Sequence, residues 1–405
     1  MIDIKGKNIR HVKNMNRNVI LEFIRNQGPI TKAEIAARTH LSFTAINNIV
    51  DELIREGLIM EAGFDISSGG RKPILLDINP SGVYTVGVHL SAFSVKAAVI
   101  NFRGAPVVQE ETKLADAADR GALIASILQA VQSIIDLSKL PREKFVGIGL
   151  ASPGPLDPNK GVILSPPNLP GLASVPIRDL LEERFGMTVR IEKDANVMAL
   201  SELWYGAGRG MSNIVYVDAD IGIGSGIVFG RKIYQGFPYG AGEIGHGTIE
   251  LDGPKCNCGN YGCLEAVASG MAVVRRAGEE IRRGTGSELA PMYFEREDSV
   301  DLEAIIRAAN RRDELAVNLL RESARYVGIA LANIINMITP ESIVIGGCLV
   351  NEYPPYFDQL KEVALPRCFS SFHKDSLLQS SVLKSQAGVI GAGILGLERF
   401  LAGAS

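Results

Sequence analysis

Residues 243–265 read EIGHGTIELDGPKCNCGNYGCLE, a stretch that gathers one imidazole and three thiols: His246, Cys256, Cys258 and Cys263. This ligand set suits tetrahedral Zn²⁺, and four protein ligands leave no open position, so we expect a structural zinc ion. Gly259 and Gly262 permit the tight turns that a chelating loop needs. Glu243 and Glu265 flank the cluster, so a closed metal site would hold two carboxylates beside it. The alternatives are three ordinary small hydrophobic cysteines, or iron or cobalt in place of zinc, although zinc suits these ligands best.

The composition indicates a globular chain with hydrophobic cores. At 405 residues, of which 46% are apolar, the chain is long enough for two or three domains. Three of the five cysteines lie in the stretch above, which favours a reducing compartment over a disulfide framework. Residues 1–18 lack the apolar segment of a signal peptide, and no run of about 18 apolar residues predicts a membrane span. We therefore expect a cytoplasmic protein.

Charge is unevenly divided along the chain. The net charge is −3, but residues 1–72 carry eleven Lys/Arg against eight Asp/Glu, which leaves −6 on the remainder. A basic front end on an acidic body indicates a module that binds a polyanion. Charge alone is equally compatible with an ordinary solvated face.

The first eighty residues have the pattern of a winged helix-turn-helix. Apolar residues at helical spacing predict a helix over residues 16–27, which the following Gly-Pro pair ends. Thr31 and Glu34 form a capping box for a second short helix, and Ser42 caps a third helix after a tight turn. The apolar stripe of the third helix is Ile46, Ile49, Val50, Leu53 and Ile54. Two short helices joined by a tight turn are a helix-turn-helix.

In this arrangement the N-terminal turn of the third helix enters the major groove. The base-reading candidates are Ser42, Phe43, Thr44, Asn47 and Asn48. Asparagine can bond adenine through two hydrogen bonds, and threonine or phenylalanine can contact a thymine methyl group. Two extended runs then flank a Gly-rich tip at residues 67–70, which predicts a β-wing whose Arg71 and Lys72 reach phosphates or the minor groove. The alternative is a small helical module that binds another protein rather than DNA.

After residue 80 the pattern changes to apolar strands that alternate with helices, which predicts an α/β body. Strands are expected within VYTVGVHL, VKAAVIN, KFVGIGLASPG, NIVYVDADIGIGSGIVFG and ESIVIGGCLV. Helices are expected at residues 121–137, 267–283, 301–312 and 313–338. The expected domains are a winged helix-turn-helix with its linker at 1–80, a first lobe at 81–193 completed by a C-terminal helix at 386–405, and a second lobe with the zinc loop at 194–385. A cleft is expected between the two lobes.

Four segments together resemble the ROK family of repressors, open reading frames and kinases: the zinc stretch, SPGPLD at 152–157, EKDANVMALSELWYGAGRG at 192–210 and GIGSG at 222–226. The Glu-x-Gly-His plus Cys-x-Cys-x4-Cys-x-Glu combination is the specific part, and the resemblance covers essentially the whole chain. It implies a two-lobed actin-like, ribonuclease-H-like sugar-kinase fold and, with a winged helix in front, a sugar-responsive transcriptional repressor. Within the family, SSGGRKP and GPKCNCGNYGC are most similar to xylose repressors. That similarity favours a pentose effector over glucose, an amino-sugar phosphate or a polyol.

The phosphate loops of the family's kinases are altered in this chain. The kinases have Asp-x-Gly-Gly-Thr, whose small residues and backbone amides approach ATP. The corresponding residues here are His89, Ser91, Ala92 and Phe93. The kinases' second turn has a Gly-Thr-Gly core, and the corresponding residues are Asp220, Ile221 and Gly222. A carboxylate at Asp220 would repel a triphosphate at close range. Gly346 and Gly347 match the adenosine-side glycines, but a tight strand-to-helix turn is their simpler explanation. We expect no enzyme activity; the alternative is a ROK-type sugar kinase.

The resemblance also places sugar contacts on this chain. They are Asp194, Glu243, His246 and Glu265, and Asn168 lies where the family has a further sugar-side loop. Carboxylates accept hydroxyl protons, and an imidazole with one nitrogen on zinc donates from the other. Asp194 matches the family's catalytic base and is expected to be a ligand contact only. Kinases usually have Asn before this position, where this chain has Lys193; the lysine pairs with Asp194, selects a sugar phosphate or sugar acid, or turns outward to solvent.

The expected protein is a homodimer or homotetramer whose paired winged helices bind an inverted-repeat operator in double-stranded DNA. A monosaccharide or sugar derivative in the interlobe cleft would change the relation of the two heads and release the DNA, with a coupling of about 1–3 kcal/mol. Some family members respond to a protein of the sugar phosphotransferase system, which is a further candidate partner. A third hypothesis is a sugar-binding regulator whose head recruits another protein. The pattern leaves open whether the effector is an inducer or a corepressor.

Overall fold

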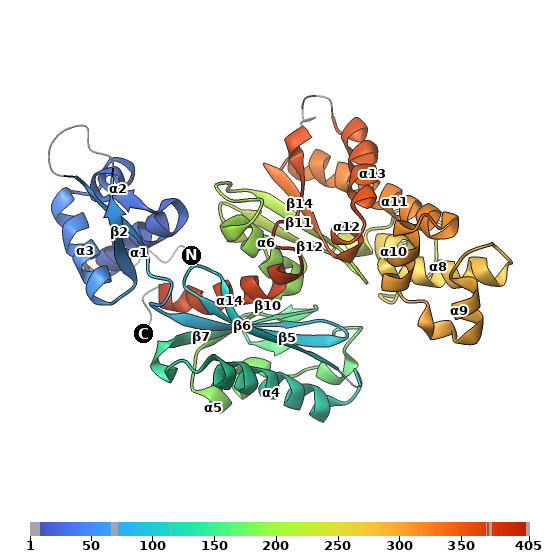
Figure 1. The fold of residues 1–405 in the computed structure, drawn as a ribbon, viewed down its shortest axis with the longest axis horizontal. Helices are drawn as coiled ribbons and strands as arrows, with labels where there is room; N and C mark the ends of the chain where they lie inside the picture. Colours follow the sequence, from blue (N-terminus) through green and yellow to red (C-terminus); the bar gives the residue numbers. More distant parts are fainter. Residues whose placement is uncertain (1–8, 66–71, 115, 370, 372–374, 402–405) are drawn as a thin grey trace. The chain divides into compact units, whose positions relative to one another are not determined.

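The computed structural model describes residues 9–65, 72–114, 116–369, 371 and 375–401. The chain forms two compact units, which we call unit 1 (Met1–Glu192 with Val389–Ser405) and unit 2 (Lys193–Gly388). Each unit contains a five-stranded mixed sheet with helices packed on it, and unit 1 also contains the N-terminal helices (Figure 1).

Both units contain strands and helices. Those of unit 1 are α1 Ile9–Gln27, β1 Ile30–Thr31, α2 Lys32–Thr39, α3 Phe43–Arg55, β2 Ile59–Phe64, β3 Ile74–Ile78, β4 Tyr84–Leu90, β5 Ser94–Asn101, β6 Pro106–Lys113, α4 Arg120–Ser138, β7 Phe145–Ser152, β8 Leu156–Asp157, β9 Val162–Ile163, α5 Ile177–Phe185, β10 Val189–Lys193 and the C-terminal helix α14 Ala387–Leu401. Those of unit 2 are α6 Asp194–Tyr205, β11 Ile214–Ala219, β12 Ile223–Phe229, β13 Lys232–Ile233, the 3₁₀ helix η3 Ile244–His246, α7 Leu264–Ala268, α8 Gly270–Arg282, α9 Ala290–Glu295, α10 Leu302–Asn310, α11 Glu314–Ile338, β14 Ser342–Gly346, α12 Cys348–Asn351, α13 Pro354–Ala364 and β15 Leu378–Ser380.

Helices α1, α2 and α3 form the predicted helix-turn-helix. The Thr31 side chain accepts from the Glu34 N–H while the Glu34 side chain accepts from the Thr31 N–H, so the predicted capping box of α2 is confirmed. Ser42 caps α3 as predicted, and its Oγ accepts from the Ala45 N–H. The first helix begins at Ile9 rather than at residue 16, because polar residues ahead of the apolar stripe extend it. One of them, Lys13, pairs with Glu52 on α3 at 2.7 Å.

Strands β2 and β3 pair in antiparallel fashion behind α3, with β1 on the other edge of β3. These two strands are the extended runs of the predicted wing. The Gly-rich tip at residues 67–70 and the DNA-contact candidate Arg71 lie outside the described residues.

A single apolar core joins the helix-turn-helix to the rest of unit 1. Ile20 of α1 and Ile46 of α3 are fully buried in it, and it continues through Phe102 and Leu397 of the α/β part. Arg103 also forms an ion pair with the buried Asp77 on β3. Burial and charge therefore hold the helix-turn-helix against its own unit.

The large sheet of unit 1 has the strand order β10-β7-β4-β5-β6, with β4 parallel to β7 and antiparallel to β5. Helix α14 packs very closely on this sheet: a Cβ at Gly149 would lie 1.8 Å from the Ala392 carbonyl oxygen, so only glycine fits there. Among the described residues α4 is the one helix long and apolar enough to cross a membrane. Its buried positions, which face the core of unit 1, are Leu123, Ile127, Ala130, Val131, Ile134 and Ile135. This spacing is that of an amphipathic core helix.

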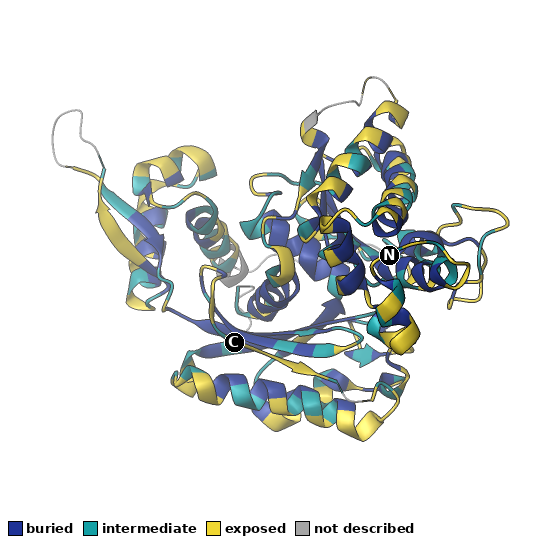
Figure 2. Ribbon diagram, turned by 45° about the vertical axis from the view of Figure 1, so that its right-hand side comes forward, coloured by how far each residue is buried: buried dark blue, intermediate teal, exposed yellow. Residues whose placement is uncertain are grey.

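The sheet of unit 2 has the order β13-β12-β11-β14-β15, with β11 antiparallel to β12 and parallel to β14. Buried strands alternate with helices whose outer faces are exposed (Figure 2). The helix predicted at 267–283 is in fact two helices, α7 and α8. They are separated by Ser269, which adopts an extended conformation and caps α8 by accepting from the Ala272 N–H.

Candidate functional site

The four predicted metal ligands come together in unit 2. Their ligand atoms all lie within 4.8 Å of one another, with Cys256 Sγ 3.7 Å from His246 Nδ1 and Cys258 Sγ 3.7 Å from Cys263 Sγ. A tetrahedron of Zn–S bonds of about 2.3 Å has S···S edges of about 3.8 Å. The cysteines are free thiols rather than a disulfide, and their separation fits the edge of such a tetrahedron. The cluster can therefore hold a metal ion.

The loop geometry forces these ligands together. His246 ends η3, and Cys263 precedes α7 and pairs across an isolated bridge with Thr248. The Cys256 N–H donates to the Asn260 carbonyl, which closes the turn that carries Cys258. At Gly262, with φ of 64°, an added Cβ would lie 1.6 Å from the Glu250 carbonyl oxygen. The turn predicted from this glycine is thus required by close backbone contact.

The thiols differ in acidity. Burial raises the pKa of Cys263 to about 12 and also raises the pKa of Cys256. The backbone N–H of Asn260 lowers the pKa of the exposed Cys258. A bound cation would stabilise all three thiolates, because metal binding displaces thiol protons.

Two predicted effector carboxylates flank the cluster in the structure. Glu243 immediately precedes η3, and Glu265 lies in the first turn of α7. Glu265 Oε2 accepts from the Ile223 N–H at 3.1 Å, which orients this carboxylate by the start of β12. His246 directs Nδ1 at the thiols, so its other ring nitrogen is left to interact outside the cluster.

Lys193 is buried and pairs with Glu243. Its Nζ lies 2.7 Å from Glu243 Oε1 and 2.7 Å from the Ala241 carbonyl oxygen. The lysine is thus not turned outward, and Glu243 is a carboxylate that it bonds.

Asp194 begins α6 directly after the chain enters unit 2. Burial raises its pKa to about 6, while the Ala195 N–H and the Lys193 charge act in the opposite direction. Its Oδ1 accepts from the Ala195 N–H at 2.7 Å. Asp194 is therefore mostly ionised at neutral pH and protonated in mild acid.

Asn168 lies on an exposed turn between β9 and α5 in unit 1, and the other effector candidates belong to unit 2. Its predicted role stays a prediction.

A second group of polar side chains, the half-buried Asp218 and Asp220 with their partners, lies at the C-terminal end of β11. Asp220 accepts from the Cys348 thiol at 2.8 Å and from the Cys348 and Ile221 N–H groups. Burial, together with the Asp220 and Asp194 carboxylates, raises the pKa of Asp218 well above its usual range. Asp218 in turn accepts from the buried Tyr216 hydroxyl. The sequence reasoning used Asp220 but missed Asp218, although an aspartate inside the apolar run NIVYVDAD was an available signal.

The glycines at the end of β14 are required by packing. A Cβ at Gly346 would lie 2.0 Å from the Tyr216 hydroxyl, and a Cβ at Gly347, where φ is 93°, would lie 2.2 Å from the Ala219 carbonyl oxygen. The tight strand-to-helix turn therefore accounts for both glycines without a nucleotide.

The candidate base-reading residues lie on the first turns of α3. Phe43 is 54% exposed, and Ser42, Thr44 and Asn48 are exposed as well, while Asn47 is half-buried. The side-chain oxygen of Ser42 already accepts the hydrogen bond that caps the helix. Lys72, which lies two residues before the start of β3, is exposed.

Several basic residues of the front end are neutralised within the helix-turn-helix. Lys32 pairs with Asp51 at 3.2 Å, and Arg17 pairs with Glu56. Lys13 is likewise paired, as described above. Each pair joins one positive and one negative charge of residues 1–72, so the surplus of three positive charges in that segment is unchanged.

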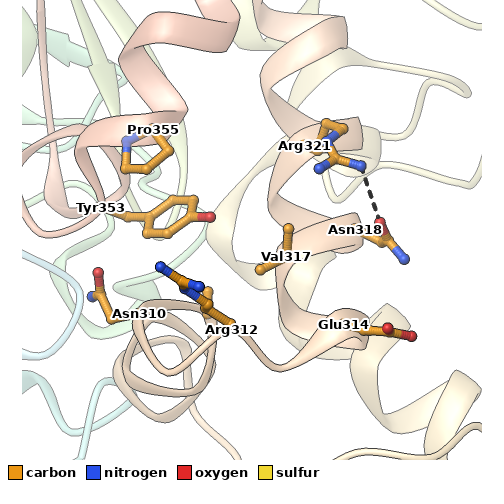
Figure 3. A pocket seen from close by; sticks show the side chains of 9 residues that line it. Asn310, Arg312, Glu314, Val317, Asn318, Arg321, Tyr353 and Pro355 are labelled. Carbon is orange, nitrogen blue, oxygen red and sulfur yellow. Dashed lines mark hydrogen bonds between the residues drawn. The ribbon is translucent and has the colours of Figure 1, made fainter.

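A cavity of about 620 Å³ lies elsewhere in unit 2 (Figure 3). Arg312, Arg321 and Tyr353 are among its lining residues, which come from the α10–α11 turn, α11 and the segment before α13. None of the predicted effector residues lines it, so its size does not support an effector site there.

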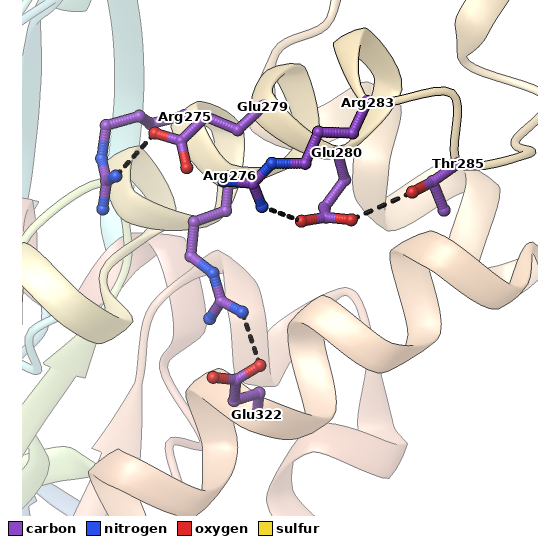
Figure 4. A network of polar contacts seen from close by, with 7 residues as sticks. All are labelled: Arg275, Arg276, Glu279, Glu280, Arg283, Thr285 and Glu322. Atoms are coloured by element: carbon purple, nitrogen blue, oxygen red, sulfur yellow. Dashed lines mark hydrogen bonds and ion pairs between the residues drawn. The ribbon is translucent and has the colours of Figure 1, made fainter.

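Ion pairs hold the helical layer that follows α7. Arg276 on α8 reaches Glu322 on α11 at 2.5 Å, and Glu280 joins Arg283 to Thr285 (Figure 4). Such surface pairs contribute little each. Their effect is to add to the apolar contacts that fix the helices behind Glu265.

Comparisons with known proteins agree with this geometry. The pattern that defines the ROK family matches residues 85–399, and a winged helix-turn-helix DNA-binding pattern matches residues 16–60. A putative xylose repressor of Caldicellulosiruptor sp. (strain Rt8B.4) is 31% identical over 393 residues, which cover 96% of this chain and 97% of the relative. A crystal structure of a ROK family transcriptional regulator, described as a homolog of the E. coli MLC protein, superposes with a TM-score of 0.81 at 27% identity, covering 97% of each chain.

A kinase of known structure is also similar. The ROK family glucokinase from Streptomyces griseus, solved with glucose and AMPPNP, superposes with a TM-score of 0.69 at 26% identity. The match covers 77% of this chain and 99% of the kinase. These likenesses confirm the predicted fold, a winged helix-turn-helix followed by an α/β sugar-kinase-like body.

Proposed function

Because the chain belongs to the ROK family and carries a winged helix-turn-helix ahead of the family domain, we propose that it is a cytoplasmic, sugar-responsive transcriptional repressor. Its regulator character rests on its relatives, which include a putative xylose repressor and a ROK transcriptional regulator. The single observation that carries the proposal is α3: a capped helix whose N-terminal turn exposes Phe43, Thr44 and Asn48. That is the part of a helix-turn-helix that reads base edges.

The operator is proposed to be an inverted repeat bound by a homodimer or homotetramer. A helix-turn-helix dimer places its two recognition helices about one turn of DNA apart, so half-site spacing mirrors the spacing of the heads. An effector that prefers the state with mismatched heads then releases DNA without touching the DNA surface.

The effector is proposed to be a monosaccharide held by Asp194, Glu243, His246 and Glu265, with xylose as the first candidate. Support comes from three side chains that border one loop and from the xylose repressor among the relatives. Asp194 is half-buried and Glu265 is oriented by a backbone N–H, so both can accept sugar hydroxyl protons in fixed directions.

The metal is proposed to be structural Zn²⁺ bound by His246, Cys256, Cys258 and Cys263. A closed shell of four protein ligands supplies no open position for substrate, so its contribution is to fix the loop. With Nδ1 of His246 on the metal, the remaining ring nitrogen donates to a ligand.

Phosphotransfer is not part of the proposed function. Asp220 places a carboxylate at the β11 turn that kinases of the family use for phosphate, and Cys348 holds it there. Such a carboxylate repels a triphosphate at close range. The similarity to a glucokinase structure keeps a sugar kinase as the second candidate. An ATP-coupled assay tests it, because turnover that disappears in Asp194→Asn would support the kinase.

The decisive experiment measures operator binding against a sugar panel at fixed salt. Duplexes selected from a random library by the intact protein supply the operator, and fluorescence anisotropy follows its release by xylose, glucose, N-acetylglucosamine and xylitol. Release by one sugar, with about 5- to 150-fold loss of operator affinity, is the expected result. If no preferred duplex is selected, the repressor proposal is contradicted, and a winged helix-turn-helix that recruits another protein is favoured.

A further inference from the structure

Lys193 stands where the family's kinases have asparagine, and the structure gives its ammonium group a definite partner. Lys193 Nζ donates to Glu243 Oε1 and to the Ala241 carbonyl oxygen, each at 2.7 Å. Only 7% of the lysine side chain is exposed, against 47% of the Glu243 side chain. The lysine therefore lies beneath Glu243 and acts on the surface of the site through that carboxylate.

The pair fixes a loop as well as a side chain. Lys193 is the first residue of unit 2, and Glu243 and Ala241 lie fifty and forty-eight positions later in the segment that leads into His246. Charge-assisted hydrogen bonds of this length are among the stronger polar contacts in proteins. One ammonium thus orients the Glu243 carboxylate and anchors the backbone just before it.

The charge of the site follows from the same contact. Asp194, Glu243 and Glu265 contribute three carboxyl groups, and Lys193 contributes the one positive charge among these four side chains. Since the ammonium is bonded to Glu243, its charge is largely offset there. Asp194 and Glu265 keep the set net negative at neutral pH.

We propose that Lys193 is a positioning and specificity-determining residue of the effector site: it holds Glu243 in place as a hydroxyl acceptor and makes the site take uncharged sugars while excluding sugar acids and sugar phosphates. This inference rests on the proposed effector site. It opposes the other role open to this lysine, recognition of an anionic ligand.

An anionic ligand would meet two obstacles. To bond it, the ammonium must leave Glu243, and separating a buried ion pair leaves an uncompensated charge. A ligand carboxylate or phosphate would also approach Asp194 and Glu265, whose charges have the same sign. An uncharged polyol meets neither obstacle, because its hydroxyl groups donate to carboxylates that are already in place.

Four sugars that differ at one ring carbon make a sharp test. Xylose, glucose, glucuronate and glucose 6-phosphate share the same ring hydroxyl pattern and differ in whether the fifth carbon carries hydrogen, a hydroxymethyl group, a carboxylate or a phosphorylated hydroxymethyl group. Glucosamine adds a cationic member. Calorimetry on the intact protein at pH 7.5 should show that xylose or glucose binds at least about tenfold more tightly than both anions.

Substitution of the lysine should move the selectivity in one direction. Lys193→Met removes the one positive charge among these four side chains, so the affinity for the uncharged sugar should fall about tenfold or more as Glu243 loses its anchor. Glucosamine should gain relative to glucose. Lys193→Asn keeps a polar donor and should retain more of the uncharged-sugar affinity than Lys193→Met does. Glu243→Gln frees the ammonium and should narrow the gap between glucose and glucuronate.

The control is Lys232→Met, which removes an exposed lysine of the same unit and should leave all five affinities unchanged. Tighter binding of glucuronate or glucose 6-phosphate than of glucose, abolished by Lys193→Met, would overturn the proposal and establish anion recognition. Binding of no sugar would overturn it together with the effector site. Sugar affinities in the expected order, without release of the operator, would support the proposed role of Lys193 and contradict the proposed repressor mechanism. The failure of one proposal can therefore be distinguished from the failure of the other.

Discussion

In unit 1 the candidate base-reading side chains lie within seven consecutive residues, from Ser42 to Asn48. The candidate effector contacts of unit 2 instead come from separate segments, and Lys193 and its partner Glu243 are fifty positions apart. The first set projects from a helix that an apolar core holds, with Ile46 and Val50 fully buried beneath it. The second set is held by a cluster of metal ligands and a buried ion pair. One region therefore depends on packing and the other on charge and coordination.

This difference predicts which chemical changes should leave the function of each region unchanged. Apolar packing is insensitive to chelators and to mild acid, while thiolates and carboxylates respond to both. A chemical change directed at unit 2 should thus leave DNA affinity intact and remove its response to sugar. The predictions below test that separation.

The largest expected effect is loss of the metal. Cys258→Ser removes one thiolate of the proposed site, so metal content should drop and sugar affinity should fall at least about 100-fold, because even outer-shell changes cost 10- to 100-fold. Metal analysis and calorimetry measure the two quantities. Operator affinity without sugar should stay within about twofold of the unaltered protein.

A matched control is Cys368→Ser, which alters a buried free thiol outside the cluster. It should leave metal content unchanged. Full metal content in Cys258→Ser would show that the cluster is not the metal site, and equal loss of operator affinity would break the separation between the regions.

The next effect is on packing in the helix-turn-helix. Ile46→Ala empties a fully buried position beneath α3 and should lower the free energy of unfolding of that core by about 2–5 kcal/mol. Operator binding should weaken strongly, while metal content and sugar affinity stay unchanged. Denaturant unfolding followed by near-ultraviolet signals and calorimetry checks both halves of the prediction.

Ile54→Ala is not a suitable control because Ile54 is partly buried and packs at the edge of the same core. Val107→Ala, on exposed β6, removes similar apolar surface and should change unfolding by less than about 0.5 kcal/mol. Loss of sugar binding in Ile46→Ala would mean that the two regions share one cooperative core.

The helix-turn-helix could be predicted from the sequence because its signals are local. The capping pair Thr31–Glu34, the cap Ser42 and the stripe from Ile46 to Leu53 each act within a few residues of the chain. The metal ligands were equally accessible, since they fall within eighteen consecutive positions. The family resemblance supplied the fold of the α/β body, which strand periodicity alone left open.

Partner choice between distant segments could not be predicted. Nothing in the residues near Lys193 indicates that its ammonium bonds Glu243, which lies fifty positions later in the chain. The same holds for the bond between Cys348 and Asp220, which joins two strand ends 128 positions apart. The ion pairs of Lys32 with Asp51 and of Arg17 with Glu56 likewise join residues that the charge count alone could not pair.

A change of pH should also affect unit 2 more than the helix-turn-helix, with a smaller effect than the changes above. Burial raises the pKa of Asp194 from 3.8 to about 6, so the folded protein binds this proton more tightly than the unfolded chain does. The free energy of unfolding should therefore fall as pH rises from about 4 to about 6, by at most about 3 kcal/mol from this group. Asp194→Asn should recover that stability at pH 7 and give no gain below pH 4.

Sugar affinity should run in the opposite direction. The Asp194 carboxyl group is a stronger acceptor of a sugar hydroxyl proton when it is ionised, so affinity should rise through pH 6 and level off above it. Lys193 and Glu243 face Asp194 and shift the midpoint, but the sign is set by burial. Exposed Asp358→Asn is the matched control and should alter neither profile. Sugar affinity that is flat between pH 5 and pH 7.5 would remove Asp194 from the effector site.

The smallest effects concern the division of labour on the DNA face. Asn48→Ala should cost about 1–3 kcal/mol of operator affinity, concentrated at one base pair, because an exposed asparagine on α3 can bond adenine. Lys72→Ala should weaken all duplexes by a similar factor and lower the slope of log affinity against log salt by about 1, since a phosphate contact carries no sequence information. Binding to single-position operator variants at three salt concentrations distinguishes the two. The same chemical change at Asn318, on the exposed surface of α11, should have no effect. An unchanged base preference in Asn48→Ala would indicate that Thr44 or Asn47, rather than Asn48, contacts the base. The local character of the first region would stand, because all three residues lie on one turn-and-a-half of a helix that its own caps and core hold in place.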